Sequence, residues 1–414
     1  MRNWARNIRF NDAQTLMPTS IDGLQRIVAN NSSVRARGTA HSFNSIADTN
    51  GVGILLSEMP RVIEVDSARS VVRVSSGLRY GDLAQSLHAK GFALHNLASL
   101  PHISIAGAIA TGTHGSGVTN GSLSTEVRAL DLVLADGDIR RLTREDLDDT
   151  FNAAVVGLGL LGIVSTLELD IEPTYEISQV VYPNFPRSLF YEKVNEILSA
   201  AYSVSFFTTW GEKDDDQVWT KERTSQSSAE RESELFGIPA TSAKQHPIPG
   251  IDPIHCTEQL AQPGVWHERL PHFKLEFTPS AGDELQSEYL VPRSCAAQAL
   301  AALEPISAEI NELLQVSEIR TVKADNLWLS PSYRRDVVGI HFTWKKTDEI
   351  YQLLSRIEKV LANFQARPHW GKIFTYDRDY LASVYPKFSE FKTLAETLDP
   401  TAKFQNALTA EIFS

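Results

Sequence analysis

The chain has 414 residues, of which 42% are hydrophobic, and a formal net charge of −12. This length is large for one hydrophobic core, so we expect two domains. The acidic balance argues against nucleic acid or a membrane surface as a partner, because either would need clustered Lys and Arg. Cys256 and Cys295 are the only cysteines, which disfavours a disulfide framework and a zinc site. Residues 1–10 carry no apolar signal segment and no later stretch is long enough for a membrane span, so we expect a cytoplasmic protein. We also expect a monomer that binds no metal.

The first half of the chain alternates short strands with helices. Capping hydroxyls with apolar residues three and four apart indicate helices, β-branched runs between turn formers indicate strands, and Asp136-Gly137 indicates a hairpin. The expected elements are a helix at 19–28, strands at 53–56, 61–65 and 70–74, a helix at 80–91, strands at 127–134 and 139–142, and a strand at 163–170.

The sequence changes character at Glu172-Pro173, where we expect a domain boundary. The first domain would be 1–173, completed by 376–414, and the second 174–375. In the second we expect a helix at 189–201, a strand at 204–207, a polar and partly mobile loop at 220–250, extended segments at 273–277 and 286–291, a helix at 294–314, strands at 318–322 and 337–344, and a helix at 348–364. This order predicts an antiparallel sheet with helices on one face, and the whole chain is α+β.

Two runs of small residues, 35–44 and 111–117, each contain one histidine. Glycines permit unusual backbone angles, and successive N–H groups can then form a nest for an anion. We interpret both runs as cradles for one phosphate-bearing cofactor. Two ordinary surface loops are the alternative.

Residues 157–162 match the GxGxxG pattern of dinucleotide-binding βαβ units. The pattern requires a helix to open on the glycines, whereas Ile163 begins a β-branched, strand-like run. We therefore reject a Rossmann unit. A glycine-rich loop beside a planar ligand and a simple tight turn remain equal alternatives.

Other histidines indicate no separate catalytic centre. His114-Gly115-Ser116 suggests a serine hydrolase but lacks the GxSxG elbow, so this class stays a minor alternative. His88, His95 and His102 are seven residues apart, too widely spaced for the two ligands of a zinc helix. We interpret these three as packing or surface histidines.

The second domain contains a pattern of polar residues on strands. Side chains at i and i+2 share a face, so Glu318 and Arg320 point one way, and His341 and Thr343 follow the same rule. If the two strands are neighbours, one face presents a carboxylate, a guanidinium, an imidazole and a hydroxyl, which suits a polyhydroxylated substrate. A solvated face with a Glu–Arg pair is the alternative. Lys372 lies in a rigid turn and is a plausible placed cation.

Six segments together closely resemble the alditol oxidases, which belong to the vanillyl-alcohol-oxidase type of FAD protein, a group that also contains aldonolactone oxidases. The resemblance extends over essentially the whole chain and implies the two-domain FAD-binding fold of that type, with an antiparallel-sheet substrate (cap) domain. The segments are 37–44, 98–104, 110–117, 318–322, 341–344 and 368–372.

The resemblance implies that His41 is bonded covalently to the 8α-methyl group of FAD, for which a neutral imidazole nitrogen is a suitable nucleophile. The other implied cofactor contacts are Arg37, Gly38, Thr39, Ala40, Ser42, Phe43, Ser99, Ser104, Gly107, Thr111, Gly112, Thr113, His114, Ile163 and His369. The implied polyol-binding set is Ser99, Glu318, Arg320, His341, Thr343 and Lys372, and the catalytic residues among them are Arg320, Lys372 and Glu318.

The implied reaction is oxidation of a terminal alcohol of an alditol such as xylitol or sorbitol, with hydride transfer to flavin N5. Arg320 and Lys372 would stabilise alkoxide character, and Glu318 would orient neighbouring hydroxyls. Dioxygen would reoxidise the flavin, giving hydrogen peroxide and an aldose. An aldonolactone or other sugar oxidoreductase is the alternative enzyme, although Glu318 makes an anionic substrate less favourable. A non-catalytic flavin or carbohydrate-binding protein is the alternative of another class. The region 220–250 matches the family poorly and leaves the preferred chain length open.

Overall fold

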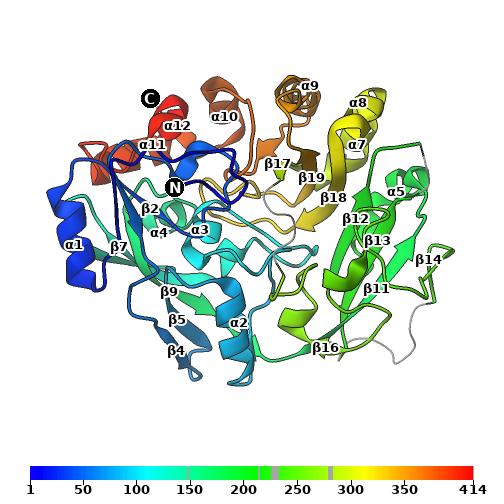
Figure 1. Cartoon of the computed structure of the whole chain (residues 1–414), viewed down its shortest axis with the longest axis horizontal. Coiled ribbons are helices and arrows are strands. Elements are labelled where there is room, and N and C mark those ends of the chain that lie inside the picture. Colours follow the sequence, from blue (N-terminus) through cyan, green and yellow to red (C-terminus); the bar gives the residue numbers. More distant parts are fainter. Residues whose placement is uncertain (147–148, 213–214, 225–232, 278–282, 414) are drawn as a thin grey trace.

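The protein is described from a computed structural model that covers residues 1–146, 149–212, 215–224, 233–277 and 283–413. Figure 1 shows two bodies side by side. The N-terminal part of the chain, from blue to teal, forms one body together with the red C-terminal helices. The green, yellow and orange part forms the other, around one large sheet.

A small sheet at the N-terminus presents the first small-residue loop. Its strands are all parallel, in the order β1-β3-β2, and α1 connects β1 to β2. Ser20 caps α1 by accepting a hydrogen bond from the amide of Gly23, as the capping hydroxyl predicts. The bounds are β1 Gln14–Leu16, α1 Ile21–Asn30, β2 Val34–Arg37, the 3₁₀ turn Ser45–Ala47 and β3 Val52–Leu55.

A five-stranded sheet forms the rest of the first body, in the order β4-β5-β9-β7-β8, with every pair antiparallel. The predicted strands are confirmed, and so is the 127–142 hairpin, whose turn contains Gly137 at φ +92°. The strands are β4 Ile63–Asp66, β5 Val71–Ser75, β7 Val127–Val133, β8 Ile139–Thr143 and β9 Ile163–Asp170. The helices and short elements around them are α2 Tyr80–His88, β6 Phe92–Ala93, α3 Ile105–Ala110, the 3₁₀ turn Leu123–Glu126, α4 Thr150–Val155 and β10 Glu172–Pro173.

The glycine run 157–162 leads into β9, not into a helix, and β9 pairs antiparallel with both of its neighbours. The rejection of a Rossmann unit at this run is therefore confirmed.

The large sheet of the second body has the order β16-β11-β13-β12-β18-β19-β17-β20, and all its pairs are antiparallel, as predicted. Its strands are β11 Glu176–Pro183, β12 Ser203–Thr208, β13 Gln217–Arg223, β16 Gly264–Val265, β17 Glu284–Pro292, β18 Leu314–Val322, β19 Val337–Lys345 and β20 Arg367–Pro368. Outside it, β14 Glu234–Leu235 pairs with β15 Ile238–Pro239, and 3₁₀ turns lie at Pro253–His255 and Trp266–Glu268.

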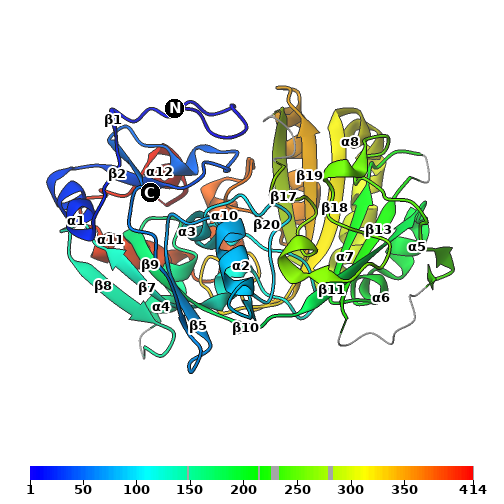
Figure 2. The ribbon, with the colours of Figure 1, turned by 60° about the horizontal axis from the view of Figure 1, so that its bottom comes forward.

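Helices cover one face of this sheet (Figure 2). Ile319, Ile340 and Phe342 point to that face and share one buried apolar cluster with Leu300 of α7 and Leu354 of α9. Their polar neighbours along the strands therefore point the other way, as the i, i+2 rule predicts. The helices are α5 Arg187–Glu192, α6 Val194–Leu198, α7 Ala296–Leu303, α8 Ser307–Leu313 and α9 Ile350–Ala362.

Two segments that were each predicted as one continuous helix are interrupted in the structure, so these predictions are wrong. The helix predicted at 189–201 is broken at Lys193, which separates α5 from α6. The helix predicted at 294–314 becomes the 3₁₀ turn Arg293–Cys295, α7, a second 3₁₀ turn at Glu304–Ile306, and α8. Pro305 lies in that second turn, and it has no amide hydrogen to continue a helix.

The loop predicted at 220–250 is also partly wrong, because residues 220–223 complete β13 between β11 and β12. Residues 225–232 of that loop lie outside the described part of the chain. The segment 273–277 forms only an isolated bridge, between Phe273 and Cys256.

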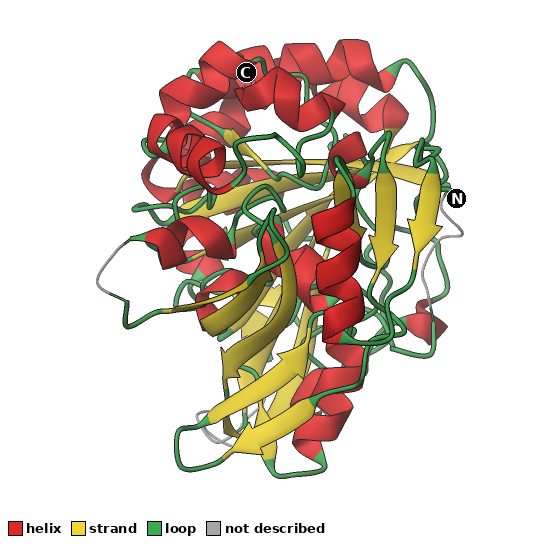
Figure 3. Cartoon of the chain, turned by 90° about the vertical axis from the view of Figure 1, so that its left-hand side faces the viewer, coloured by secondary structure: helices red, strands yellow, loops and turns green. Residues whose placement is uncertain are grey.

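Three C-terminal helices return to the first body, where Tyr385, Phe391 and Phe413 share an apolar cluster with Leu130 of β7. Figure 3 shows the C-terminal end of the chain within a band of helices. On this basis we propose a boundary near residue 173, with 376–414 completing the first domain. The helices are α10 Arg378–Val384, α11 Phe388–Leu398 and α12 Ala407–Phe413.

Within the described ranges, no helix combines the length and the apolar character needed to cross a bilayer. The same residues contain no group of three or more His, Cys, Asp or Glu side chains arranged to hold a metal ion. Both cysteines are free thiols.

Candidate active site

One cavity of about 500 Å³ is lined by both bodies. The first body contributes the small-residue loops and the glycine run, and the second contributes the polar face of its sheet. The cavity contains every predicted cofactor and substrate residue except Gly112. Gly112, at φ +69°, lies outside this lining, and a Cβ atom added there would meet Pro331, so its cofactor contact stays a prediction. The cavity size is in the range usual for small-molecule sites.

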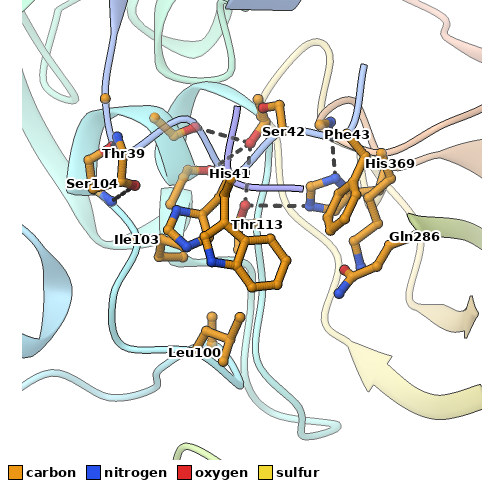
Figure 4. A pocket seen from close by; sticks show the side chains of 18 of the residues that line it. Thr39, His41, Ser42, Phe43, Leu100, Ile103, Ser104, Thr113, Gln286 and His369 are labelled. Carbon is orange, nitrogen blue, oxygen red and sulfur yellow. Dashed lines mark hydrogen bonds between the residues drawn. The ribbon is translucent and has the colours of Figure 1, made fainter. Parts of the chain in front are cut away.

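Loop 38–44 leaves β2 and lies against the beginning of α3. A Cβ atom at Gly38 would collide with the hydroxyl of Ser104, so only glycine permits this approach. The Ser104 amide donates to Thr39 Oγ1 at 3.1 Å, and the Thr39 amide donates to Ser104 Oγ at 3.4 Å. These bonds join two of the predicted cofactor loops into one wall of the cavity (Figure 4).

The side chain of His41 lies in this wall without a fixed polar partner. Among the described residues, neither of its buried ring nitrogens makes a well-formed hydrogen bond, although the Thr39 backbone lies close enough to favour the protonated ring slightly. Burial is the main reason that its pKa is lowered to about 4, with a smaller contribution from His102, so the imidazole is neutral at pH 7. The indole of Trp4 stacks on it, with ring centroids 5.3 Å apart and planes inclined by 19°. This contact was not predicted.

His369 stands on another side of the cavity and bonds to Thr113 of the second small-residue loop. Its Nδ1 accepts from the amide of Gly371 at 3.1 Å, so the proton of the neutral ring lies on Nε2. Burial holds the pKa of His369 well below its usual value, which keeps the ring neutral. Nε2 then donates to Thr113 Oγ1 at 3.4 Å.

The polar sheet face is assembled by three adjacent strands. In the register, Glu318 of β18 and Glu288 of β17 both lie opposite His341 of β19, and Arg320 lies opposite Gly339. The predicted adjacency of the 318–322 and 337–344 strands is therefore confirmed. Glu318, Arg320, His341 and Thr343 are all buried, which excludes the alternative of a solvated face.

Glu288 is the central residue of this face, and the sequence analysis missed it. Its carboxylate lies 2.6 Å from Lys372 Nζ, 3.3 Å from Arg320 Nη2 and 3.3 Å from His114 Nε2. Burial alone would raise its pKa, but Lys372, His114 and Arg320 hold the pKa well below the usual value. Glu288 is therefore an ionised counter-charge for the two predicted catalytic cations. The alternation of polar residues along 284–288 was a usable signal for this face.

Lys372 and His341 determine the direction of a hydrogen bond at Thr343. The Lys372 ammonium has only hydrogens to give, so His341 Nδ1 accepts from it at 2.6 Å. Burial, with Lys372, lowers the pKa of His341 to about 3, so the ring is neutral and its proton is on Nε2. Nε2 donates to Thr343 Oγ1 at 3.0 Å, which leaves the Thr343 hydroxyl hydrogen for a ligand.

Arg320 connects the two bodies across the cavity. Its Nη1 donates to Ser99 Oγ at 3.0 Å and lies 3.5 Å from Glu318 Oε2. Glu318 and Glu288 both raise the pKa of Arg320, so it stays positive although it is buried.

The remaining sequence candidates take structural roles. Arg35 is buried and donates to the carbonyls of Leu158 and Gly159, so the glycine run is both a tight turn and part of the cavity wall. The hydroxyl of Ser116 is buried and donates to the carbonyl of Val204, which is a structural role. His88 bonds to Thr174 and His102 to the carbonyl of Leu275, as expected for packing histidines. His95 Nδ1 lies 3.0 Å from Glu126 Oε1.

Comparison with known proteins assigns the family. A model described as FAD binding domain matches residues 13–143, and one described as D-arabinono-1,4-lactone oxidase matches residues 283–412. An alditol oxidase from Streptomyces sp. is 46% identical over 415 residues, covering 99% of this chain and 98% of that protein. The chain belongs to the alditol oxidase family of FAD-dependent oxidoreductases.

More distant relatives include lactone-oxidising enzymes. An L-gulonolactone oxidase from Mus musculus is 24% identical, covering 100% of this chain and 98% of that protein. An L-gulono-1,4-lactone dehydrogenase from Mycobacterium tuberculosis is 27% identical, covering 99% and 98%. Cholesterol oxidase from Brevibacterium sterolicum has a TM-score of 0.79 at 12% identity, covering 100% of this chain and 96% of that one. This last similarity shows the vanillyl-alcohol-oxidase-type fold that the sequence predicts.

The cavity suits the FAD of the alditol oxidase family. The cradle between Gly38 and Ser104 brings two loops together where added side-chain atoms would collide. His41 presents a neutral imidazole whose nitrogens are buried without a well-formed hydrogen bond among the described residues. Leaving such groups buried is costly unless a ligand contacts them. The residues present therefore fit the cofactor.

Proposed function

We propose that this oxidoreductase oxidises the terminal primary alcohol of an alditol such as xylitol or sorbitol. The observation that carries the proposal is the buried polar face, which combines hydroxyl acceptors, hydroxyl donors and two cations inside the cofactor cavity. The alditol oxidase from Streptomyces sp. supports the same substrate class. When bound, FAD would accept a hydride from the alcohol carbon at N5 and pass the electrons to dioxygen, giving hydrogen peroxide and an aldose.

Arg320 and Lys372 would act on the reacting hydroxyl. Both cations are held in place by their ion pairs with Glu288. Negative charge that develops on a substrate oxygen between them would therefore be stabilised without any rearrangement of the two side chains. Burial lowers the pKa of Lys372, while Glu288 opposes this shift and favours the ammonium form. The Thr343 hydroxyl would donate to another oxygen of the polyol.

Glu318 would accept a hydrogen bond from a neighbouring hydroxyl of the substrate. Burial alone would raise its pKa, but Arg320 and His272 keep the pKa well below the usual value. An ionised carboxylate of this kind is a strong acceptor and a weak base. Its charge also disfavours a sugar acid.

Anaerobic mixing with xylitol tests the function directly. We expect the yellow holoprotein to lose its flavin colour, and aeration to restore the colour with one hydrogen peroxide formed for each aldose. A holoprotein that keeps its colour with xylitol and sorbitol would contradict the proposal and favour a non-catalytic binding protein. Faster reduction by L-gulono-1,4-lactone than by either alditol would favour the lactone enzyme, the candidate supported by the two gulonolactone relatives.

We also propose that His41 forms the covalent bond to the 8α-methyl group of the flavin. Its neutral ring supports this role, because a nucleophilic nitrogen needs a free lone pair. In the His41→Ala variant, acid precipitation should release all the yellow colour into the supernatant, whereas wild type and a His88→Ala control should keep it in the pellet. Colour retained in the His41→Ala pellet would remove His41 from this role. The cytoplasmic location and the monomeric state stay predictions.

A further inference from the structure

A buried histidine, His272, lines the cavity beside Glu318, and a buried lysine, Lys221, contacts the other nitrogen of its ring. The His272 ring is held edge-on between Phe207 and Trp219, with centroid distances of 5.3 and 5.6 Å. Its Nε2 lies 2.8 Å from Glu318 Oε1, and its Nδ1 lies 3.2 Å from the Nζ of Lys221. His272 is also tied to the opposite body, because its amide donates to the carbonyl of Ser99 at 3.2 Å.

The contacts of Lys221 determine which nitrogen of His272 carries the proton. Lys221 is 1% exposed, and its Nζ donates to the carbonyls of Leu270 and Pro271. Burial lowers the pKa of Lys221 to about 7, while Glu318 favours the ammonium form, whose third hydrogen points to His272 Nδ1. Because the Glu318 carboxylate is ionised and can only accept, His272 Nε2 must be the donor between them. Burial and Lys221 lower the pKa of His272 to about 4, so the ring is neutral and its single proton is on Nε2. The imidazole therefore donates to Glu318.

This donation makes the two oxygens of Glu318 unequal. Oε1 accepts from His272 and also from Ser205 Oγ, each at 2.8 Å. Within the described part of the chain, the one close polar contact of Oε2 is with Arg320 Nη1, at the longer distance of 3.5 Å. The carboxylate is thus fixed by two donors on one oxygen and keeps the other for a new partner.

We propose that His272, held in its Nε2–H form by Lys221, is a positioning residue that turns Glu318 so that Oε2 accepts a hydroxyl of the polyol. The proposal rests on the alditol oxidation proposed above. Lys221 is not among the residues that line the cavity, whereas His272 lines it beside Glu318, so a double-mutant cycle with Glu318 must show that the effect of His272 passes through that carboxylate. The hydroxyl accepted by Oε2 is present in the bound substrate and in the transition state alike. Loss of the orientation should therefore weaken substrate binding more than it slows hydride transfer.

Two amide variants separate this role from packing. In His272→Asn, the side-chain oxygen can still accept from Lys221, but the shorter side chain does not reach Glu318. In His272→Gln, the longer amide can contact both. Anaerobic rapid mixing with xylitol measures the dissociation constant and the limiting rate of flavin reduction. We expect a dissociation constant raised about tenfold to a hundredfold in His272→Asn, with a limiting rate changed less than threefold, and recovery to near wild type in His272→Gln.

The pH profile provides a second measurement that packing alone would not move. Without the His272 donor the pKa of Glu318 rises, so the acid limb of xylitol binding should move to higher pH in His272→Asn and return in His272→Gln. Ser205→Ala removes the other donor to Glu318 Oε1, and it should also move the acid limb of xylitol binding to higher pH. This variant allows the orientation of Glu318 to be tested even if His272→Asn does not fold.

A double-mutant cycle decides whether His272 acts through Glu318. In a Glu318→Gln background, adding His272→Asn should change xylitol binding less than threefold. If the two substitutions raised the xylitol dissociation constant independently, so that their effects multiplied, the inference would be overturned. Wild-type binding by His272→Asn would also overturn it. In either case, reduction of the wild-type flavin by xylitol would still support the proposed function. Failure of wild type to be reduced would overturn the proposed function, and this inference with it.

Discussion

Replacing Arg320 by alanine is expected to slow flavin reduction by xylitol about a hundredfold to a thousandfold, the range seen when one preorganised donor to a developing oxyanion is removed. Arg320 is 6% exposed and bridges Ser99, Glu318 and Glu288, so alanine would remove a buried cation that three partners hold in place. Single-turnover reduction under anaerobic conditions measures the effect, and the flavin spectrum should show that the cofactor is still bound.

Two further variants make the Arg320 test specific. Arg320→Lys keeps the charge but loses the planar fork that contacts Ser99 and Glu288 together, so we expect a smaller loss than with alanine. Arg356→Ala removes an exposed arginine that pairs with Glu309 on the surface, and it should reduce at the wild-type rate. A wild-type rate in Arg320→Ala would assign Arg320 to structure and remove it from the reaction.

The polar sheet face was predictable because its pattern is local. Alternation along a strand places Glu318 with Arg320, and His341 with Thr343, whatever the rest of the chain does. Their adjacency was also accessible, since β18 and β19 follow each other along the chain and pair antiparallel. These four residues of the face could therefore be predicted from the sequence without knowledge of the elements that surround them.

Glu288 and Lys221 were missed for the opposite reason. A charged residue on a strand is usually solvated, and only the position of β17 beside β19 places Glu288 under the two cations. Lys221 fell in a segment predicted as a loop, whereas it lies in β13 and its ammonium is satisfied by carbonyls some 50 residues later. Both burials depend on tertiary contacts that no short sequence window contains.

The broken helices show a different limit. The helix predicted at 294–314 runs through Pro305, because the helical spacing of apolar residues continues on both sides of the proline. In the structure α7 and α8 both pack on the sheet, with a 3₁₀ turn between them where the amide hydrogen is missing. Pro305 is visible in the sequence, and it is a stronger indication of a helix break than the apolar spacing is of a continuous helix.

Glu288→Gln should have the largest effect on stability. Removing one partner from a buried charge cluster costs about 3–5 kcal/mol, because Arg320 and Lys372 remain buried without their shared counter-charge. The folded-state pKa of Glu288 lies well below the unfolded value near 4.5, so its contribution is fully present above that value and is lost as the pH falls through the folded pKa. Denaturant unfolding should therefore show a wild-type advantage at pH 7 that shrinks in acid.

The same variant should shift the pH dependence of the reaction. Glu288 raises the pKa of Lys372 against the effect of burial, so without it that pKa falls further. Lys372 would then lose its proton at lower pH, and the alkaline limb of the flavin reduction rate should move toward neutrality, with activity partly recovered as the pH is lowered. Glu309→Gln, on the exposed surface pair with Arg356, is the matched control and should change neither property. If Glu288→Gln kept the wild-type alkaline limb, Glu288 would not be the group that maintains the charge of Lys372.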